Sequence, residues 1–360
     1  MRSGLVLLAC LGAAAAQWPN LCPNQPADAY AQVRCPANAT CSPNGFSEGG
    51  GQGCCPWPNA VSCPSGYQCC PAGTTCTLIS GATYGATYSC DSPSAPSVTS
   101  KCPCKPGAPL RPSATKKNVL VIGDSLSIGY TPAVAANLSD VALVQHAPFD
   151  VRDGGAEEAA YLLQCLDFWT AHPSGIPFVP DLVWFNSGMH NLATAGTPGH
   201  GTVPGQGGNS SEYGPQLAAA TTRLVAWAAA NKVKLIYAWT TPYLNNAATD
   251  AVITGTLNPA AGAIMTSCKW AGGPRAEQGG LFFLPALTTL RWPPFSPPLP
   301  CAVGIPQVDL HKPIIDKCGA APQASCFGQV GCWSPHCPPG YSWLATNFIA
   351  PAIRAALATP

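Results

Sequence analysis

A serine lies where a strand-to-helix turn can expose it for nucleophilic chemistry. Gly123-Asp124-Ser125 directly follows the apolar run Asn118–Ile122, which is typical of a buried strand. A hydroxyl at such a turn can face a cleft, and the backbone N–H groups that begin the next helix can stabilise an oxyanion. Ser and Asp are also common helix N-caps, so the tripeptide alone fits a structural role equally well.

Three further groups of polar and glycine residues follow later predicted elements. Two of them follow the second and third predicted strands, and the third precedes a predicted terminal helix. Because the carboxyl ends of parallel strands meet at one edge of a sheet, all of them can reach the serine. The three groups are Asp153-Gly154-Gly155, Asn186-Ser-Gly188-Met-His190-Asn191, and His336 with Gly340-Tyr341.

These four blocks, in this order, resemble those of the SGNH, or GDSL, hydrolases. That family contains serine esterases and lipases. The resemblance covers about residues 118–356. It implies a three-layer α/β/α sandwich with a parallel, flavodoxin-like sheet.

The resemblance also implies roles for particular residues. Ser125 is expected to attack an acyl carbonyl, and His336 is expected to take its proton and return it to the leaving alcohol. The backbone N–H of Ser125 and one at Gly154 or Gly155 would bind the oxyanion, together with a side chain of the third block.

The third block departs from the family pattern. His190 stands where the family has its asparagine, and Asn191 stands at the aspartate position. Either side chain can donate an N–H to an oxyanion. We favour His190, and the alternative is that His190 is structural and Asn191 donates.

The fourth block lacks the family's acid. The family's aspartate lies three residues before its histidine, and here Trp333 occupies that position. We therefore expect a Ser125–His336 dyad, with the imidazole oriented by another acceptor. Asp309 and Asp316 are candidates for a displaced carboxylate.

Strand and helix patterns alternate after residue 117, as expected for a parallel sheet covered on both faces. The predicted strands are Asn118–Ile122, Val141–His146, Leu182–Asn186, Leu235–Thr240 and Ile305–Leu310. The predicted helices are Thr131–Asn137, Ala156–Ala171, Gln216–Asn231 and Trp343–Ala358.

The preceding region is rich in cysteine. Twelve cysteines lie between Cys22 and Cys104, and the paired Cys54-Cys55 and Cys69-Cys70 are each followed by proline. This spacing resembles the granulin family, a stack of disulfide-stapled β-hairpins, over about residues 35–76. We therefore assign residues 17–90 to a granulin-like module and the Pro/Ser-rich residues 91–117 to a linker.

Composition indicates an extracellular protein. Residues 1–16 read as a secretory signal peptide, with an apolar run too short to span a bilayer. The chain has 20 cysteines, which favours disulfides over zinc in an oxidising compartment, even for the cluster near His336. Three sequons, at Asn38, Asn137 and Asn209, are consistent with a glycoprotein.

The small net charge of the chain argues against a nucleic acid as the binding partner. The formal net charge is +1 and only 9% of residues are charged, which argues against nucleic-acid binding. No later segment predicts a membrane span, and no motif indicates a cofactor or a metal site.

Residues 269–303 do not fit the alternating pattern. The stretch is Gly-rich and then Pro-dense, and it would complete neither a helix nor a strand. We interpret it as a disordered insertion in the domain 118–360. A retained intron is one explanation, because omitting the stretch removes Cys301 and leaves an even number of cysteines in this domain.

Two functions remain open from the sequence. The first is a secreted carboxylic-ester hydrolase acting on an acylated substrate, such as a glycan that carries O-acetyl or other short acyl groups. The second is a catalytically silent glycoprotein whose cysteine-rich module binds a protein or polysaccharide partner.

Overall fold

The computed structural model describes residues 19–25, 27–43, 52–66, 68–82, 84–105, 110–147, 155–171, 178–192, 207–243, 246–267, 304–319, 326–328 and 336–359. The expected signal peptide 1–16 and the predicted insertion 269–303 lie outside these residues. Gly154 and Trp333 do as well.

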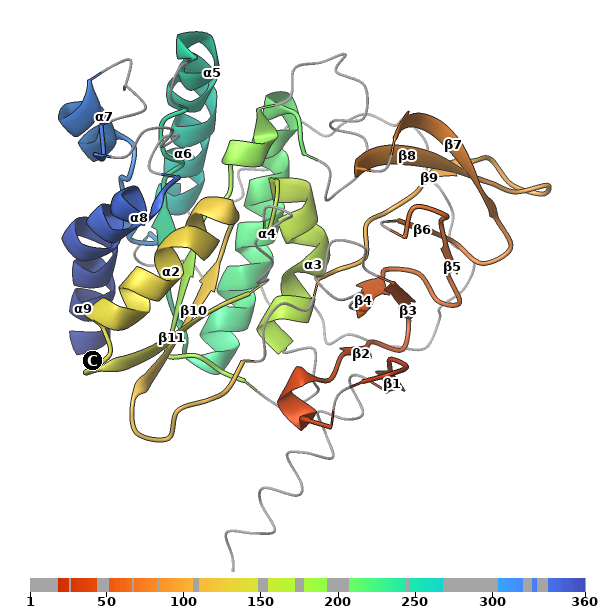
Figure 1. Ribbon diagram of the computed structural model, residues 1–360, viewed down its shortest axis with the longest axis horizontal. Helices are drawn as coiled ribbons and strands as arrows, with labels where there is room; N and C mark the ends of the chain where they lie inside the picture. The colour runs from red at the N-terminus through yellow and green to blue at the C-terminus, as the bar shows by residue number, and fades with distance from the viewer. Residues whose placement is uncertain are drawn as a thin grey trace, which may run out of the picture.

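A parallel five-stranded sheet forms the centre of the C-terminal domain (Figure 1). Its order is β11-β10-β12-β13-β14, which places the first two strands of the domain in reversed order, as in flavodoxin-like sheets. The strands are β10 (Lys117–Ile122), β11 (Ala142–His146), β12 (Leu182–Phe185), β13 (Lys234–Ala238) and β14 (Gln307–Val308). The carboxyl end of β10, where the order reverses, is where such sheets bind ligands.

Both faces of the sheet are buried, which gives three layers. Alternate residues of β10 enter two separate cores: Leu120 and Ile122 face one, and Val119 and Val121 face the other. The first core is covered by α3 (Ala159–Ala171), α4 (Ser210–Asn231) and α6 (Asn258–Ser267). The second is covered by α2 (Ser125–Asn137), α8 (Pro338–Leu344), η4 (Ala345–Ile349) and α9 (Ala350–Ala358), on the opposite side in Figure 1. The predicted three-layer α/β/α fold is confirmed.

Several helices differ from their predicted bounds. Helix α2 begins at Ser125 rather than at Thr131, because Asp124 caps it and the helix continues through Pro132. The terminal helical segment likewise begins at Pro338, five residues before its predicted start.

Two helical regions were not predicted. One is the short α7 (Lys312–Cys318), and the other is α5 (Ala247–Val252), which continues through the π-helical η3 (Ile253–Leu257) into α6. The second region contains weak helix formers, so it depends on a buried stripe at four-residue spacing. The residues of that stripe are Ile253, Leu257, Ala261 and Met265.

The N-terminal module consists of antiparallel pairs held by disulfides. The pairs are β1 (Asn20–Leu21) with β2 (Arg34–Cys35), β3 (Thr40–Pro43) with β4 (Gln52–Cys55), β5 (Val61–Ser62) with β6 (Cys69–Cys70), and β7 (Thr75–Ala82) with β8 (Tyr84–Asp91). The module also contains a short 3-10 helix, η1 (Ala29–Ala31). The bridges within the module are Cys22–Cys41, Cys35–Cys54, Cys55–Cys69, Cys63–Cys76 and Cys70–Cys90. This is the predicted arrangement of disulfide-stapled hairpins.

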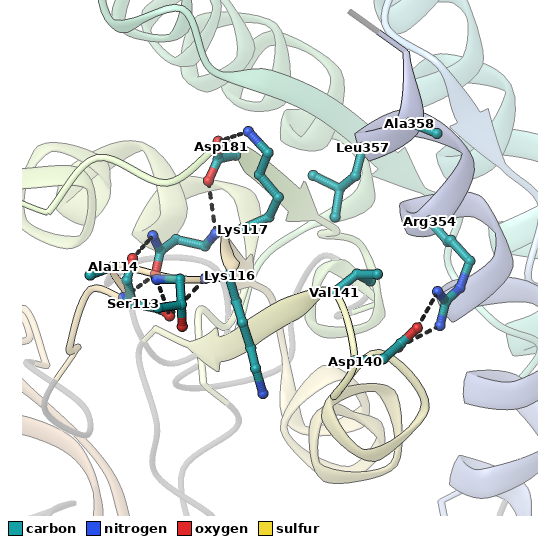
Figure 2. Close-up of a pocket in the computed structure, with 12 residues that line it drawn as sticks. Ser113, Ala114, Lys116, Lys117, Asp140, Val141, Asp181, Arg354, Leu357 and Ala358 are labelled. Atoms are coloured by element: carbon teal, nitrogen blue, oxygen red, sulfur yellow. Dashed lines mark hydrogen bonds and ion pairs between the residues drawn. The ribbon is translucent and has the colours of Figure 1, made fainter.

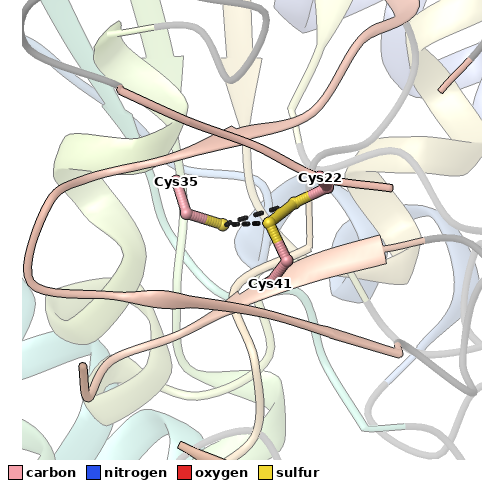
Figure 3. A group of neighbouring side chains, drawn as sticks. All are labelled: Cys22, Cys35 and Cys41. Carbon is pink, nitrogen blue, oxygen red and sulfur yellow. Dashed lines mark hydrogen bonds between the residues drawn. A yellow bond between two sulfur atoms is a disulfide. The ribbon is translucent and has the colours of Figure 1, made fainter. Parts of the chain in front are cut away.

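The sulfur atoms gather closely enough to resemble a metal centre. Figure 3 shows Cys22, Cys35 and Cys41, whose sulfurs lie within 4.8 Å of one another. Cys22 and Cys41 are bonded to each other, and Cys35 is bonded to Cys54. Since all these sulfurs are in disulfides, the cluster is a covalent ladder with no thiolate to bind a metal.

Part of the predicted linker pairs with the module and with the C-terminal domain. The strand β9 (Val98–Thr99) extends the β7–β8 hairpin, and Cys104 forms a β-bridge with Cys54. Cys104 is also joined by a disulfide to Cys165 on α3. The module is therefore covalently fixed to the C-terminal domain beside α3.

None of the helices in the described part of the chain is long and apolar enough to cross a membrane.

Candidate active site

Ser125 is the first residue of α2, at the carboxyl end of β10. Asp124 caps the helix, because its carboxylate accepts a hydrogen bond from the Leu126 backbone N–H at 3.1 Å. The other carboxylate oxygen of Asp124 accepts a hydrogen bond from the Asn186 amide, also at 3.1 Å. Asp124 is buried while Ser125 is half-exposed, so the cap fixes the turn and leaves the Ser125 hydroxyl accessible.

Gly155 lies beside this turn. It forms an isolated β-bridge with Asp124, and the following N–H, of Ala156, donates to the Gly123 carbonyl at 2.8 Å. Gly155 has φ +69°, and a Cβ there would lie 2.4 Å from the Gly123 oxygen. The position therefore requires glycine for both conformation and space.

His336 contacts Ser125 through one ring nitrogen and Tyr341 through the other, and the Tyr341 contact was not predicted. His336 Nε2 lies 3.0 Å from Ser125 Oγ. On the other side of the ring, Tyr341 Oη lies 2.6 Å from Nδ1. If Nδ1 carries the hydrogen and donates it to the phenolic oxygen, Nε2 is left to accept the proton of the Ser125 hydroxyl. This tautomer is the one that a general base requires.

Helix α2 makes room for the Tyr341 ring at Gly129. A Cβ at Gly129 would lie 2.1 Å from Cζ of Tyr341 and 2.4 and 2.5 Å from the two Cε atoms of the ring. The phenol therefore rests directly against the backbone of the helix that begins with Ser125. One helix thus positions both the hydroxyl and the phenol.

The electrostatic environment keeps both His336 and Tyr341 neutral near pH 7. Burial lowers the pKa of His336 below its ordinary value, although the Asp124 carboxylate opposes this effect. Burial and the charge of Asp124 together raise the pKa of Tyr341 to about 12. Tyr341 can therefore accept a hydrogen bond from His336 as a neutral phenol but cannot supply the negative charge of an aspartate.

Asp309 and Asp316, the two candidates for a displaced acid, have other partners. Asp309 accepts hydrogen bonds from the first backbone N–H groups of the α7 segment, at His311 and Lys312. Asp316 pairs with the Lys312 ammonium at 2.6 Å on the exposed face of α7. The described contacts of His336 include neither carboxylate, so the expectation of a displaced acid is corrected: the group against Nδ1 is the phenol of Tyr341.

His190 belongs to a buried charge cluster. Its Nδ1 lies 2.9 Å from the Glu157 carboxylate, whose second oxygen lies 3.2 Å from the Lys105 ammonium. Burial alone would lower the pKa of His190, but Glu157 outweighs it and raises the pKa to about 9. At neutral pH this pKa makes His190 an imidazolium, with a proton on each ring nitrogen.

Asn191 has a structural set of contacts. It is fully buried, its side-chain oxygen accepts the Ala159 backbone N–H at 3.0 Å, and its amide nitrogen contacts the Asn209 carbonyl. The side chain thereby ties the 3-10 segment η2 (Met189–Asn191) to the start of α3. These contacts favour His190 over Asn191 as the donor from the third block.

The cysteines near His336 that the structure describes are disulfide-bonded, and Cys332 lies outside the described residues. Cys326 pairs with Cys318, and Cys337, the residue after His336, is also in a disulfide. Their sulfurs are therefore not thiolate ligands, and the bridges anchor the segment that carries His336.

A pocket of about 610 Å³ lies at the opposite edge of the sheet from Ser125 (Figure 2). It opens beside Lys117, the first residue of β10, whereas Ser125 follows the end of that strand. Four of its charged side chains form pairs, Lys117 with Asp181 at 2.8 Å and Arg354 with Asp140 at 2.7 Å. The fifth, Lys116, donates to the Ser139 carbonyl. The pocket is therefore separate from the Ser125 site.

Comparison with known proteins found one matching family model and several similar solved structures. Residues 46–82 match the Granulin family model. The chain is similar in structure to a GDSL-like lipase from Bacteroides thetaiotaomicron, with a TM-score of 0.41 and 16% identity over 69% of this chain and 92% of the lipase. It is also similar to an acetyl xylan esterase, with a TM-score of 0.39 and 12% identity over 67% of this chain and 99% of the esterase. A search of curated proteins found no matching relative.

Proposed function

We propose that this protein is a secreted, serine-dependent carboxylic-ester hydrolase. The observation that carries the proposal is the 3.0 Å contact between His336 Nε2 and Ser125 Oγ at the carboxyl end of β10. A histidine at this distance can remove the serine proton as the oxygen attacks. The disulfide-rich module supports the extracellular assignment.

The reaction proceeds in two acyl transfers. Ser125 Oγ bonds to the acyl carbon while its proton moves to His336 Nε2, and the resulting tetrahedral intermediate expels the alcohol, which takes that proton. Water then attacks the acyl-Ser125 ester with His336 again as base. The second tetrahedral intermediate then collapses to the carboxylic acid, and His336 returns the proton to the Ser125 oxygen.

The oxyanion of each tetrahedral intermediate needs hydrogen-bond donors. Our proposal assigns this role to the Ser125 backbone N–H, to an N–H at Gly154 or Gly155, and to the His190 side chain. Ser125 begins a helix, so its N–H has no partner within the helix. Each donor contributes about 3 kcal/mol to transition-state stabilisation in comparable sites.

Tyr341 orients the base in this scheme. As His336 becomes charged, its Nδ1–H donates to a neutral phenol rather than to a carboxylate. A neutral acceptor stabilises an imidazolium less than a charged one does. We therefore expect a slower serine hydrolase than one with an aspartate in this position.

For the substrate, we propose short acyl groups such as O-acetyl groups on extracellular glycans. The proposal rests on the expected secretion and on the low charge of the chain, which disfavours strongly ionic polymers. A preference for acetyl over butyrate esters is its first consequence.

Hydrolysis of p-nitrophenyl acetate and butyrate by the secreted protein tests the proposed function. We expect Ser125→Ala to abolish turnover and Ser342→Ala, an exposed serine on α8, to leave it unchanged. Circular dichroism of both variants verifies folding. Equal background rates in folded wild type and Ser125→Ala would refute the enzyme assignment and favour the catalytically silent, partner-binding glycoprotein.

A further inference from the structure

Glu157 is a carboxylate held in an unusual position beside the site. Its side chain is 7% exposed, and its backbone lies in the left-handed region at φ +52°. A non-glycine residue there carries strain that the surrounding structure must hold in place. Glu157 follows the bridge of Gly155 with Asp124 by two residues, so the backbone that passes the Ser125 turn also places this carboxylate.

The two oxygens of Glu157 have different partners. One faces Nδ1 of His190 at 2.9 Å, and the other faces the Lys105 ammonium at 3.2 Å. The Lys105 side chain is only 1% exposed. The Glu157 carboxylate thus lies between the Lys105 ammonium and the His190 ring, and both the carboxylate and the ammonium are buried.

Lys105 is held by the junction between the two parts of the protein. Its backbone N–H donates to the Tyr161 hydroxyl at 3.0 Å, and its carbonyl accepts from the Trp169 indole at 2.8 Å. The preceding residue, Cys104, is bonded to Cys165 on the same helix. The position of the ammonium is therefore set by α3 and by the segment that joins the cysteine-rich module to the C-terminal domain.

His190 lies close enough to the Ser125 site for its charge to affect the pKa of His336. The charge of His190 lowers the pKa of His336, and the Asp124 carboxylate raises that of His190. Besides Glu157 and Asp124, the charged groups that face His190 include Glu158. His190 also leaves 28% of its side chain exposed, so part of the ring is accessible from solvent.

We propose that Glu157 is a positioning residue that holds His190 as a charged oxyanion donor, and that Lys105, on the segment that joins the cysteine-rich module to the C-terminal domain, holds Glu157 in place. With Nδ1–H donated to Glu157, the remaining N–H of the ring, at Nε2, is the one available to an oxyanion. This inference rests on the proposed function. In this arrangement, the segment that joins the module to the C-terminal domain contributes Lys105 to the surroundings of the active site.

Two readouts test it in the full secreted chain. The first is the NMR titration of isotope-labelled histidine, with the His190 signal assigned by its loss in His190→Asn. We expect titration near pH 9 in the wild type and at clearly lower pH in Glu157→Gln, because burial still lowers the pKa of His190 while Asp124 and Glu158 only partly oppose it. Glu212→Gln, an exposed glutamate on α4, is the matched control.

The second readout is the pH dependence of p-nitrophenyl acetate hydrolysis. At pH 8, we expect Glu157→Gln to lower kcat about 10- to 100-fold with little change in KM, because the oxyanion exists only in the transition state. The ratio to wild type should approach one at acid pH, where His190 is protonated in both proteins. A purely structural role of Glu157 would give a deficit independent of pH.

If Glu157→Gln does not fold, a double variant can be used for the same two measurements. Lys105→Met with Glu157→Gln removes both buried charges and leaves neither unpaired. It must show the same lowered His190 titration and the same pH-dependent deficit. An unchanged titration, or kinetics like those of Glu212→Gln at every pH, would overturn this inference alone. A wild type no more active than Ser125→Ala would overturn the proposed function and this inference with it.

Discussion

Tyr341→Phe tests the most unusual feature of the proposed catalytic group, a phenol where the family has a carboxylate. The substitution removes only the oxygen that lies 2.6 Å from His336 Nδ1. It leaves the ring that packs against Gly129. The local structure should therefore be preserved, and the lost interaction is a single hydrogen bond.

The expected loss of activity depends on how the strength of this hydrogen bond changes when His336 becomes protonated. In the ground state both partners are neutral, and such a bond contributes about 1 kcal/mol. In the transition state His336 carries a positive charge, and a hydrogen bond to a charged group contributes about 1.5–3 kcal/mol. The substitution raises the barrier by the difference between these values, about 0.5–2 kcal/mol. Because solvent reaches the exposed His336 and can replace part of the bond, we expect the lower half of this range, about a two- to fivefold loss of kcat/KM.

The assay is hydrolysis of p-nitrophenyl acetate by wild type, Tyr341→Phe and the control Tyr243→Phe. Tyr243 is an exposed tyrosine beyond β13, with 41% of its surface accessible. We expect the loss to appear mainly in kcat. Rates for Tyr341→Phe equal to those of Tyr243→Phe would refute the assignment of Tyr341 as the orienting group.

Three further predictions concern pH, packing and the module junction. The pH profile of kcat/KM should have its acid limb below pH 6.5, because burial lowers the pKa of His336 and the base must be neutral. Its alkaline limb should lie near pH 9, where His190 loses its proton; a profile flat from pH 7 to 11 would contradict the charged donor. Gly129→Ala should reduce activity at least as much as Tyr341→Phe, although alanine favours a helix by about 1 kcal/mol, because the Cβ displaces the phenol; unchanged kinetics would show that the ring is not needed there. Replacing Cys104 and Cys165 by serine should lower the free energy of unfolding by about 2–4 kcal/mol and reduce kcat, and chemical denaturation with parallel kinetics checks both effects. Loss of stability with unaltered kcat would show that the junction does not influence the site.

The serine side of the site could be predicted from the sequence because its signals are local. An apolar run followed by Gly123-Asp124-Ser125 predicts a strand and a turn, and the structure has β10 and the start of α2 there. Alternation of strand and helix patterns predicted the parallel sheet for the same reason.

The remaining side chains could not be predicted because their partners are distant in sequence. Tyr341 was noted as part of the terminal block, but only the packing of its ring at Gly129 shows that it faces His336. Lys105 was placed in a linker, because a lysine among prolines predicts exposure; its burial depends on a glutamate 52 residues away. The sequence thus favoured a Ser125–His336 dyad oriented by an unnamed acceptor, with Asp309 and Asp316 as alternatives, and it did not identify the phenol of Tyr341 as that acceptor.

Covalent trapping of the nucleophile tests the central claim most directly. The secreted protein is incubated with a fluorophosphonate, which reacts with activated serines, and its peptides are analysed by mass spectrometry. Our account predicts one adduct, on Ser125, formed in step with loss of esterase activity and absent after mild denaturation before labelling. Full loss of activity with an adduct on another residue, or full esterase activity with Ser125 unmodified by excess reagent, would contradict it.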